Sequence, residues 1–409
     1  MGGGLMQLVA YGAQDIYLTG NPQITFFKVV YRRHTNFSME AIEQTLNGTT
    51  DFGGRCTATI SRNGDLVHRM YWEWKITTFD TTADDEDTCA NLGSAVFKEM
   101  ELEIGGQKID KHYGHWLEAY AELTESNPAG KVGQEAVAGT LTNGTLFQNM
   151  SGMGGVEGVA NHTADQGVRF TPLQFWFCRN PGLALPLIAL QYHEVKLITE
   201  FESRVKCVSA STSADSDGAK LVPKLYADYI YLDTDERRRF AQVSHEYLIE
   251  QLQFTNSSST VANHTLNFNH PVKELIWTGG ASANSHATQS TETGPSTHVA
   301  LGGGTYQLKL NGHDRFSARP MEYFTRTQVW GHHTGYGGMD VDQDATGCLD
   351  SIAVYSFALK PEEHQPSGTC NFSRIDNAEL VLSVADAIFI YAVNYNVLRI
   401  MSGMGGLAY

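Results

Sequence analysis

The sequence contains few features of a secreted miniprotein, a metalloprotein or a redox enzyme. Its 409 residues include only six cysteines, at positions 56, 89, 178, 207, 348 and 370, and no C-x-x-C pair. This spacing is typical neither of a disulfide framework nor of a zinc site. The cysteine content therefore favours a reducing compartment.

Basic residues are also scarce. Lys and Arg total 29 against 45 Asp and Glu, which gives a net charge of −16. A protein that neutralises nucleic-acid phosphates over a broad face needs the opposite balance. We interpret the acidity as an aid to solubility and expect no direct contact with nucleic acid.

Long hydrophobic runs are absent as well. The longest, Leu183–Leu190, falls far short of the roughly 18–20 residues that span a bilayer. The first residues lack the basic region and apolar core of a signal peptide. Gly2 is followed by Met6 where a myristoylation motif has Ser or Thr. We expect no membrane span and no lipid anchor.

Catalytic and metal-binding motifs are missing too. No phosphate-binding loop, dinucleotide fingerprint or G-x-S-x-G elbow occurs. Asp340–Gly347 imitates a calcium loop, but the positions that need Gly and Glu hold Ala345 and Ser351. The pairs His332–His333 and His112/His115 lack further ligands. The chain is therefore predicted to be no enzyme and to carry no cofactor and no metal.

An internal duplication is the most informative feature that is present. Residues 99–117 and 305–324 each contain an alternating strand, a Gly turn, a polar segment and an aromatic-led stretch. A shift of about half the chain predicts two similar domains, because a solenoid repeats every 20–50 residues or so. The paired positions, each 206 apart, are Leu102 and Leu308, Ile104 and Leu310, and Gly106 and Gly312.

Two more pairs extend the duplication. Leu66 aligns with Val272, again 206 apart, and Leu197 aligns with Leu382, only 185 apart. The smaller shift predicts a shorter loop in the second copy, as expected where strands are retained and loops vary.

The rest of the pattern is mostly of period two, as in Trp72, Trp74 and Ile76, which favours antiparallel sheets. Segments rich in Gly, Ser, Thr and Asn, such as 208–219 and 278–304, are predicted loops. Helices are expected only over 116–125, which ends before Pro128, and in a charged connector over 234–242. The predicted fold is all-β: two tandem eight-stranded antiparallel jelly rolls with few short helices in loops.

Several longer segments carry a family resemblance. They closely resemble the major capsid protein of nucleo-cytoplasmic large DNA viruses, nearest the chlorella-virus type within the phycodnaviruses. The resemblance runs from end to end and is broken only in the loops. The segments are 3–28, 31–37, 103–113, 181–195, 365–378 and 394–409.

The resemblance implies a structural role. In that family three chains, each with two jelly rolls, form a trimeric pseudo-hexagonal capsomer. Capsomers tile an icosahedral shell around an internal membrane, which is near the capsid but not spanned by it. The implied partners are further copies of the chain, neighbouring capsomers and minor capsid proteins, and the implied location is the virion, assembled in the host cytoplasm.

The resemblance also divides the chain. It implies an N-terminal arm over 1–26. Together with the boundary that the charged segment indicates, this gives a first roll over 27–234, a connector over 235–244 and a second roll over 245–409. Arm-anchoring aromatic and aliphatic side chains are expected, although they could equally be ordinary core of the first roll. Arginines beside them are expected to bond between chains or domains, because the guanidinium binds carboxylates bidentately. The arm and interface candidates are Tyr11, Ile16, Tyr17, Phe26, Phe27, Tyr31, Arg32 and Arg33.

Family members of the chlorella type carry glycans on outer loops, so the loop asparagines Asn143, Asn161, Asn263 and Asn284 are glycosylation candidates. Two other functions remain open. The chain could be a minor capsid paralogue, or a host-attachment or carbohydrate-binding β-sandwich protein, and its abundance in virions would separate these from a major shell protein. A cupin-like enzyme is disfavoured because no His-x-His cluster with a following Glu occurs.

Overall fold

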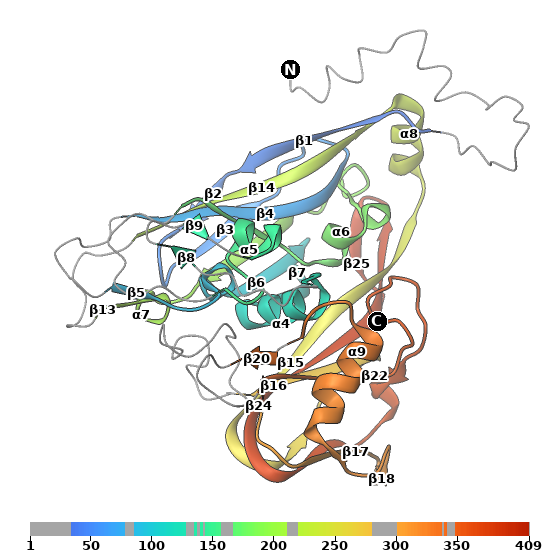
Figure 1. The fold of residues 1–409 in the computed structure, drawn as a ribbon. Helices are drawn as coiled ribbons and strands as arrows, with labels where there is room; N and C mark the ends of the chain where they lie inside the picture. The colour runs from blue at the N-terminus through green and yellow to red at the C-terminus, as the bar shows by residue number, and fades with distance from the viewer. Residues whose placement is uncertain are drawn as a thin grey trace, which may run out of the picture.

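The protein is built from two β-sandwiches that are joined by a short helix (Figure 1). A computed structural model describes residues 34–77, 86–127, 135–136, 140–141, 144–156, 167–210, 220–279, 301–337, 339–341 and 348–408. Every ladder between the described strands is antiparallel. The all-β prediction is therefore confirmed for these residues.

The first sandwich, called here the first roll, has two five-stranded sheets. The outer sheet has the order β1 (Phe37–Gln44), β14 (Lys220–Leu232), β4 (Leu66–Thr77), β10 (Arg169–Pro172), and β11 (Leu185–Pro186) also pairs with β4. The inner sheet has the order β2 (Leu46–Gly48), β3 (Arg55–Thr59), β12 (Val195–Phe201), β6 (Phe97–Ile104), β7 (Gln107–Tyr113).

Alternation of apolar and polar residues places the core of the first roll between these sheets. Trp72 is fully buried, and its ring centroid lies 5.8 Å from that of Phe97 and 5.6 Å from that of Phe201. Phe97 and Phe201 come from the opposite sheet, so the three rings join the two layers. A buried aromatic trio of this kind contributes both apolar area and edge-to-face ring contacts.

The second sandwich, the second roll, is one continuous nine-stranded sheet folded on itself. Two long strands pass through both of its layers: β15 (His245–Thr265) and β24 (Ala378–Met401). One layer adds β16 (Pro271–Gly279), β22 (Ile352–Ser356) and β23 (Cys370–Asn371); the other adds β17 (Thr305–Leu310), β18 (His313–Asp314) and β19 (Arg319–Pro320); and β25 (Met404–Leu407) pairs with the end of β24.

Short helices and small ladders connect the strands. The two expected helices are found: α4 (Gly114–Thr124) ends before Pro128, and α8 (Thr234–Gln242) links the rolls with Asp233 capping its first turn. The other helices are α3 (Leu92–Ala95), α5 (Leu146–Ser151), α6 (Trp176–Arg179), α7 (Arg204–Cys207), α9 (Gln328–His332), the 3-10 turns η2 (Pro181–Leu183) and η4 (Phe372–Arg374), and the π-helical turn η3 (Tyr323–Thr327). The small ladders pair β5 (Glu86–Thr88) with β13 (Val208–Ala210), β8 (Glu135–Ala136) with β9 (Thr140–Leu141), and β20 (Met339–Val341) with β21 (Cys348–Asp350).

The two rolls repeat the same order of elements. Hairpin β6–β7 turns at Gly105–Gly106 and hairpin β17–β18 at Asn311–Gly312, all four residues with positive φ. A two-residue hairpin turn with positive φ at both positions favours Gly and Asn, which explains the Gly turn in each copy. Both hairpins then lead into a helical segment, α4 in the first roll and η3–α9 in the second.

The ladders correct part of the predicted alignment. Leu197 pairs with Leu102, but the partner of Leu308 is Leu380, so the predicted equivalence of Leu197 with Leu382 is wrong by two residues. The predicted match of Leu66 with Val272 is also wrong, because Val272 lies in the second core whereas Leu66 packs outside the first. Alternating strands look alike after every second residue, so the sequence specified the order of elements better than their register.

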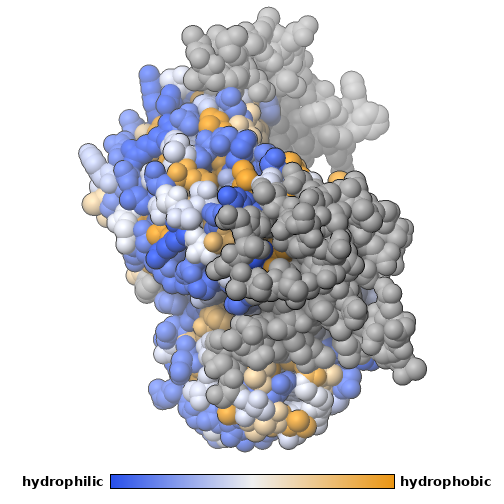
Figure 2. Space-filling view, turned by 90° about the vertical axis from the view of Figure 1, so that its left-hand side faces the viewer, coloured by the Kyte–Doolittle hydropathy of each residue, from blue (hydrophilic) through white to orange (hydrophobic). Residues whose placement is uncertain are grey.

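Within the described residues, no helix is long and apolar enough to cross a membrane. Five cysteine side chains are described, and all are free thiols: Cys56, Cys89, Cys178, Cys207 and Cys370. Figure 2 views the molecule from the left-hand side of Figure 1, and its described surface is mainly hydrophilic with scattered hydrophobic residues. This surface agrees with the interpretation of the net charge as an aid to solubility.

Candidate functional site: the junction between the rolls

An aromatic cluster joins the two rolls. The α4 helix of the first roll lies against β15 and β24 of the second, where the Trp116 and Tyr391 ring centroids are 5.2 Å apart. The His115 ring stacks on Phe389 at 4.6 Å and is hydrogen-bonded to the hydroxyl of Tyr391. Tyr391 is fully buried. The apolar core of the first roll therefore continues across the junction into the outer face of the second.

Beside the aromatic cluster is a buried group of charges. Glu250 on β15 forms ion pairs with two cations at one oxygen: Arg179 Nη2 at 2.7 Å and Lys273 Nζ at 2.8 Å. Arg179 comes from α6 of the first roll, whereas Lys273 comes from β16 of the second. The side chains of Glu250 and Lys273 are 5% and 2% exposed. Although burial alone raises the pKa of Glu250, Arg179 and Lys273 hold it below its usual value.

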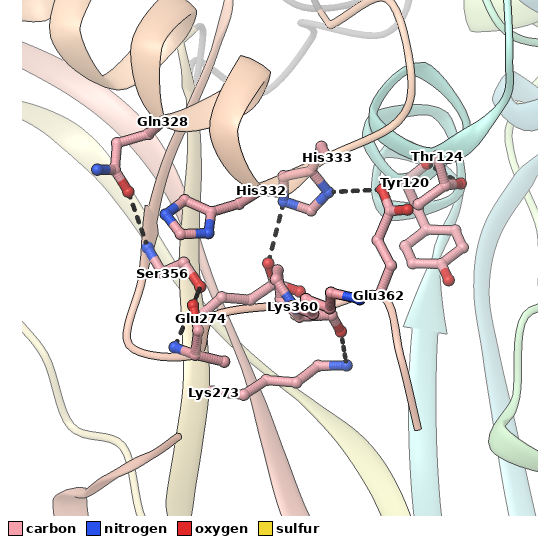
Figure 3. Close-up of polar contacts among 12 residues, drawn as sticks. Tyr120, Thr124, Lys273, Glu274, Gln328, His332, His333, Ser356, Lys360 and Glu362 are labelled. Carbon is pink, nitrogen blue, oxygen red and sulfur yellow. Dashed lines mark hydrogen bonds and ion pairs between the residues drawn. The ribbon is translucent and has the colours of Figure 1, made fainter. Parts of the chain in front are cut away.

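A second part of this group is centred on His333, which follows α9. Its Nε2 lies 3.1 Å from Glu274 and its Nδ1 lies 3.1 Å from Glu362, so the ring bridges two carboxylates (Figure 3). Burial lowers the pKa of His333, but Glu274 and Glu362 outweigh it and raise the pKa to about 9. Burial raises the pKa of Glu362, and bonds from His333 and Thr334 bring it below its usual value.

These residues form what we call the junction ion cluster. It has three cations and three carboxylates, so its formal charge is balanced when the histidine is protonated. Pairing opposite charges offsets part of the cost of removing them from water. The members are Arg179, Glu250, Lys273, Glu274, His333 and Glu362.

Backbone hydrogen bonds fasten the segment after α9 to the end of α4. The amides of Gly335 and Gly337 donate to the carbonyls of Leu123 at 2.7 Å and Glu122 at 2.8 Å. Thr334 Oγ1 donates to the carbonyl of Thr124 at 3.2 Å. The last carbonyls of a helix have no partner within it, so these donors satisfy groups that α4 itself leaves open.

A substitution at Gly335 tests the contact between the segment after α9 and the end of α4. A Cβ at this position would lie 2.3 Å from the carbonyl oxygen of Glu122 and 2.4 Å from the carbonyl carbon of Leu123. Both neighbours are backbone, so we expect Gly335→Ala to lower the free energy of unfolding by about 1–3 kcal/mol. Chemical denaturation measures it. The matched control is Gly331→Ala, which meets nothing within 4 Å and replaces a helical glycine; it should be neutral or stabilising by roughly 0.5–1 kcal/mol. Equal effects of the two substitutions would contradict the close contact.

The C-terminal end makes a separate attachment to the first roll. The amide of Tyr192 donates to the carbonyl of Gly403 at 3.0 Å, and the His193 ring contacts the backbone of Gly405. Both attachments connect the far end of the chain to its first half. The two rolls are thus held together at several points.

The junction offers no reaction chemistry. A groove of about 620 Å³ opens beside it and is lined by residues that include Tyr120, Arg179, Glu250 and Glu362. Their charged atoms are engaged with one another rather than directed at a free space. Within the part of the chain that the structure describes, no three His, Cys, Asp or Glu side chains are arranged to hold a metal ion. The arrangement is suited to fixing the geometry of two rolls.

Few of the predicted site residues can be placed. Asn263 was predicted to lie in a loop, but it lies on strand β15, where it pairs with Val381 and is exposed. The following candidates lie outside the described residues: Tyr11, Ile16, Tyr17, Phe26, Phe27, Tyr31, Arg32, Arg33, Asn143, Asn161 and Asn284.

Sequence reasoning missed the junction ion cluster. Its signal was the adjacent Lys273 and Glu274 inside an otherwise apolar strand, where a charge needs a partner. His333 was considered only as a metal ligand, whereas it binds two carboxylates. Part of the segment Asp340–Gly347, considered as a calcium loop, lies outside the described residues.

Comparison with known families accounts for both rolls. The family model "Major capsid protein N-terminus" matches residues 25–233, and the model "Large eukaryotic DNA virus major capsid protein" matches residues 236–406. The chain belongs to this major capsid protein family. Two curated major capsid proteins resemble this chain over its whole length. The major capsid protein of Pyramimonas orientalis virus is 53% identical over 424 residues, and that of Paramecium bursaria Chlorella virus 1 is 41% identical over 472 residues; each alignment covers 100% of both chains.

Solved capsid structures agree with this assignment. The quasi-atomic model of the PBCV-1 virus capsid matches with a TM-score of 0.76 and 37% identity, covering 94% of this chain and all of that one. The Faustovirus major capsid protein shares the fold alone, with a TM-score of 0.63 at 15% identity over 96% and 94% of the two chains. Three predictions are confirmed: the tandem jelly rolls, the role as a capsid protein of the virion shell, and the absence of an enzymatic function. Eight strands in each roll stay a prediction.

Proposed function

We propose that three copies of this chain form a homotrimeric, pseudo-hexagonal capsomer and that such capsomers tile the icosahedral shell of a large double-stranded DNA virus. The single observation that carries the proposal is the junction, where the aromatic cluster, the junction ion cluster and the C-terminal attachment fix one roll on the other. A capsomer made of six rolls needs each pair held at a constant angle.

The duplicated architecture supports the trimer on geometric grounds. Three chains with two rolls each supply six similar units, so a threefold ring has a nearly sixfold outline. Successive chains would meet through a heterologous interface, which closes when the rotation between copies is a third of a turn. Near-equivalent edges then allow one capsomer to pack against its neighbours.

Other parts of the proposal concern regions beyond the junction. We keep the division into an arm (1–26), a first roll (27–234), a connector (235–244) and a second roll (245–409), which the family matches at 25–233 and 236–406 support. The arm would lie on the inner side, towards minor capsid proteins and the internal membrane, and assembly would occur in the host cytoplasm. Glycans would be carried by outer loops, and Asn263, which is exposed on strand β15, is a further candidate.

Light scattering after gel filtration tests the proposed trimer. Three chains of 45.0 kDa give 3 × 45.0 = 135 kDa, the expected mass of the stable species. Electron microscopy of that species should then show a pseudo-hexagonal outline. A folded protein that remains monomeric at every concentration would contradict the trimer and favour a minor capsid or attachment role.

A further inference from the structure

In the second roll, α4 packs on the outer face of the sheet that contains β15 and β24. Because the two rolls are duplicated, the equivalent outer face of the first roll can be identified. Trp277 in β16 is buried against Tyr306 and Phe324, as Trp72 in β4 is buried against Phe97 and Phe201. The two tryptophans therefore mark equivalent positions, 277 − 72 = 205 residues apart. Positions next to them along the strands point to the outer faces of the two rolls.

In each roll, the residue before this tryptophan faces outwards, and it forms a row with its pairing partners on the two adjacent strands. In the second roll Ile276 pairs with Tyr391 on one side and Val354 on the other. In the first roll Tyr71 pairs with Tyr226 and Pro172 at the same places. Tyr391, Ile276 and Val354 are at most 1% exposed because the first roll covers them. The strands β4 and β14, which carry Tyr71 and Tyr226, lie in the top sheet in Figure 1, and Tyr71 and Pro172 also line the groove beside the junction.

This first-roll face carries an aromatic cluster, which we call the tyrosine face. The Tyr71 and Tyr226 rings are stacked at 5.6 Å, and Phe170 lies 6.3 Å from Tyr71. Met39 and Val222 on the same face are 44% and 42% exposed. The tyrosine face thus presents partly exposed rings and apolar side chains, interspersed with the charged side chains Glu43, Glu73 and Lys224 around Tyr226.

The helical segment of the second roll that is equivalent to α4 also has an exposed side. The helical segment η3–α9 follows hairpin β17–β18 as α4 follows β6–β7. Phe324 and Val329 on this segment face inwards, whereas the Trp330 side chain is 86% exposed. Leu359, whose carbonyl contacts the ring of His332 two residues after Trp330, is 76% exposed. We call Trp330 and Leu359 the tryptophan patch.

We propose that the tryptophan patch of one copy docks on the tyrosine face of the next copy, repeating between chains the contact that α4 makes within the chain. This inference rests on the proposed trimer and names its surfaces. The two surfaces lie on different rolls, so each copy gives one and receives one, and the third copy closes the ring. A second copy of this chain is the occupant because the chain already contains the matching pair of surfaces, buried against each other at its own junction.

Two single substitutions and their mixture test the pairing. Trp330→Glu and Tyr226→Glu each place a carboxylate in the proposed contact. Both positions lie on the surface, so the variants should stay folded, and their unfolding temperature should fall only by what association contributes to the trimer. We expect each variant alone to be a monomer of 45.0 kDa by light scattering. The matched control is Val384→Glu on β24, an apolar position at 52% exposure that belongs to neither surface, which should remain trimeric.

The mixture distinguishes a head-to-tail contact from a symmetric one. A Tyr226→Glu chain keeps its tryptophan patch and a Trp330→Glu chain keeps its tyrosine face, so one intact contact forms between them. An equimolar mixture should give an open dimer of 2 × 45.0 = 90 kDa and no trimer, because the remaining surfaces both carry Glu.

The possible failures are separable. A wild-type trimer with Trp330→Glu also trimeric would overturn this inference and leave the proposed function standing. Monomeric variants that give no 90 kDa species on mixing at the highest soluble concentration would overturn the assignment of the two surfaces to each other. A wild-type protein that never exceeds one chain would overturn both.

Discussion

Replacing Glu250 by Ala should cost about 3–5 kcal/mol of unfolding free energy, because it leaves two buried cations without their shared carboxylate. Arg179 and Lys273 both contact the same oxygen of Glu250, and the Lys273 side chain is only 2% exposed. Their charges would then repel each other in a region from which water is largely excluded. Equilibrium unfolding in urea measures the loss.

Two comparisons show whether burial is the cause. Glu246→Ala removes a carboxylate that is 2.7 Å from Arg399, but both side chains are more than half exposed, so the loss should be about 0–1 kcal/mol. Replacing Arg179, Glu250 and Lys273 together by Met, Leu and Met should recover much of the stability lost in Glu250→Ala, since no charge is then unpaired. A small loss for Glu250→Ala, equal to that of Glu246→Ala, would show that the cluster is not effectively buried.

The second large effect is a dependence on alkaline pH. The pKa of His333 is about 9 in the folded protein against an ordinary value of 6.5, so protonation stabilises the folded state. The contribution is complete below about pH 6.5, declines as the pH rises through about 9 and is then lost. A difference of roughly 2.5 pKa units corresponds to about 3 kcal/mol.

The measurement compares the wild type with His333→Gln at several pH values, so that other titrating groups cancel. The stability difference between the two proteins should be largest near pH 6 and should shrink towards pH 10. Glu362 has the opposite sign: its lowered pKa gives stability that is present above its ordinary pKa and lost as the pH falls below it. A difference between wild type and variant that stays constant from pH 6 to 10 would show that His333 is not a charged partner of Glu274 and Glu362.

Local pattern predicted much of the fold but less of the junction. Alternation placed Trp72 and Trp74 in a core, and the Gly turns of the two hairpins showed the duplication. Both rest on interactions between residues near one another in sequence. The pairing register of the strands could not be predicted, because Leu380 and Leu382 lie on the same face of β24 and match Leu197 equally well by pattern.

The junction lay beyond local pattern for a different reason. Arg179 and Glu250 are far apart in the chain and meet only because α6 and β15 are brought together by the packing of two rolls. His333 resembles a metal ligand in the sequence because its two carboxylate partners are distant in the chain: Glu274 lies on β16, and Glu362 lies in a turn after β22. Charges inside the apolar strand β16 were the available clue, and they indicate burial with a partner without naming it.

The path of β15 and β24 has a consequence for the order in which the protein becomes complete during synthesis. The strands of the first roll are all present once residue 232 has been made, whereas the second roll needs β24, which ends at Met401. Domains generally fold in order as they leave the ribosome. A nascent or prematurely ended chain would therefore expose Trp116 without Tyr391 to cover it. Only a chain that extends through β24 places Tyr391 over this surface.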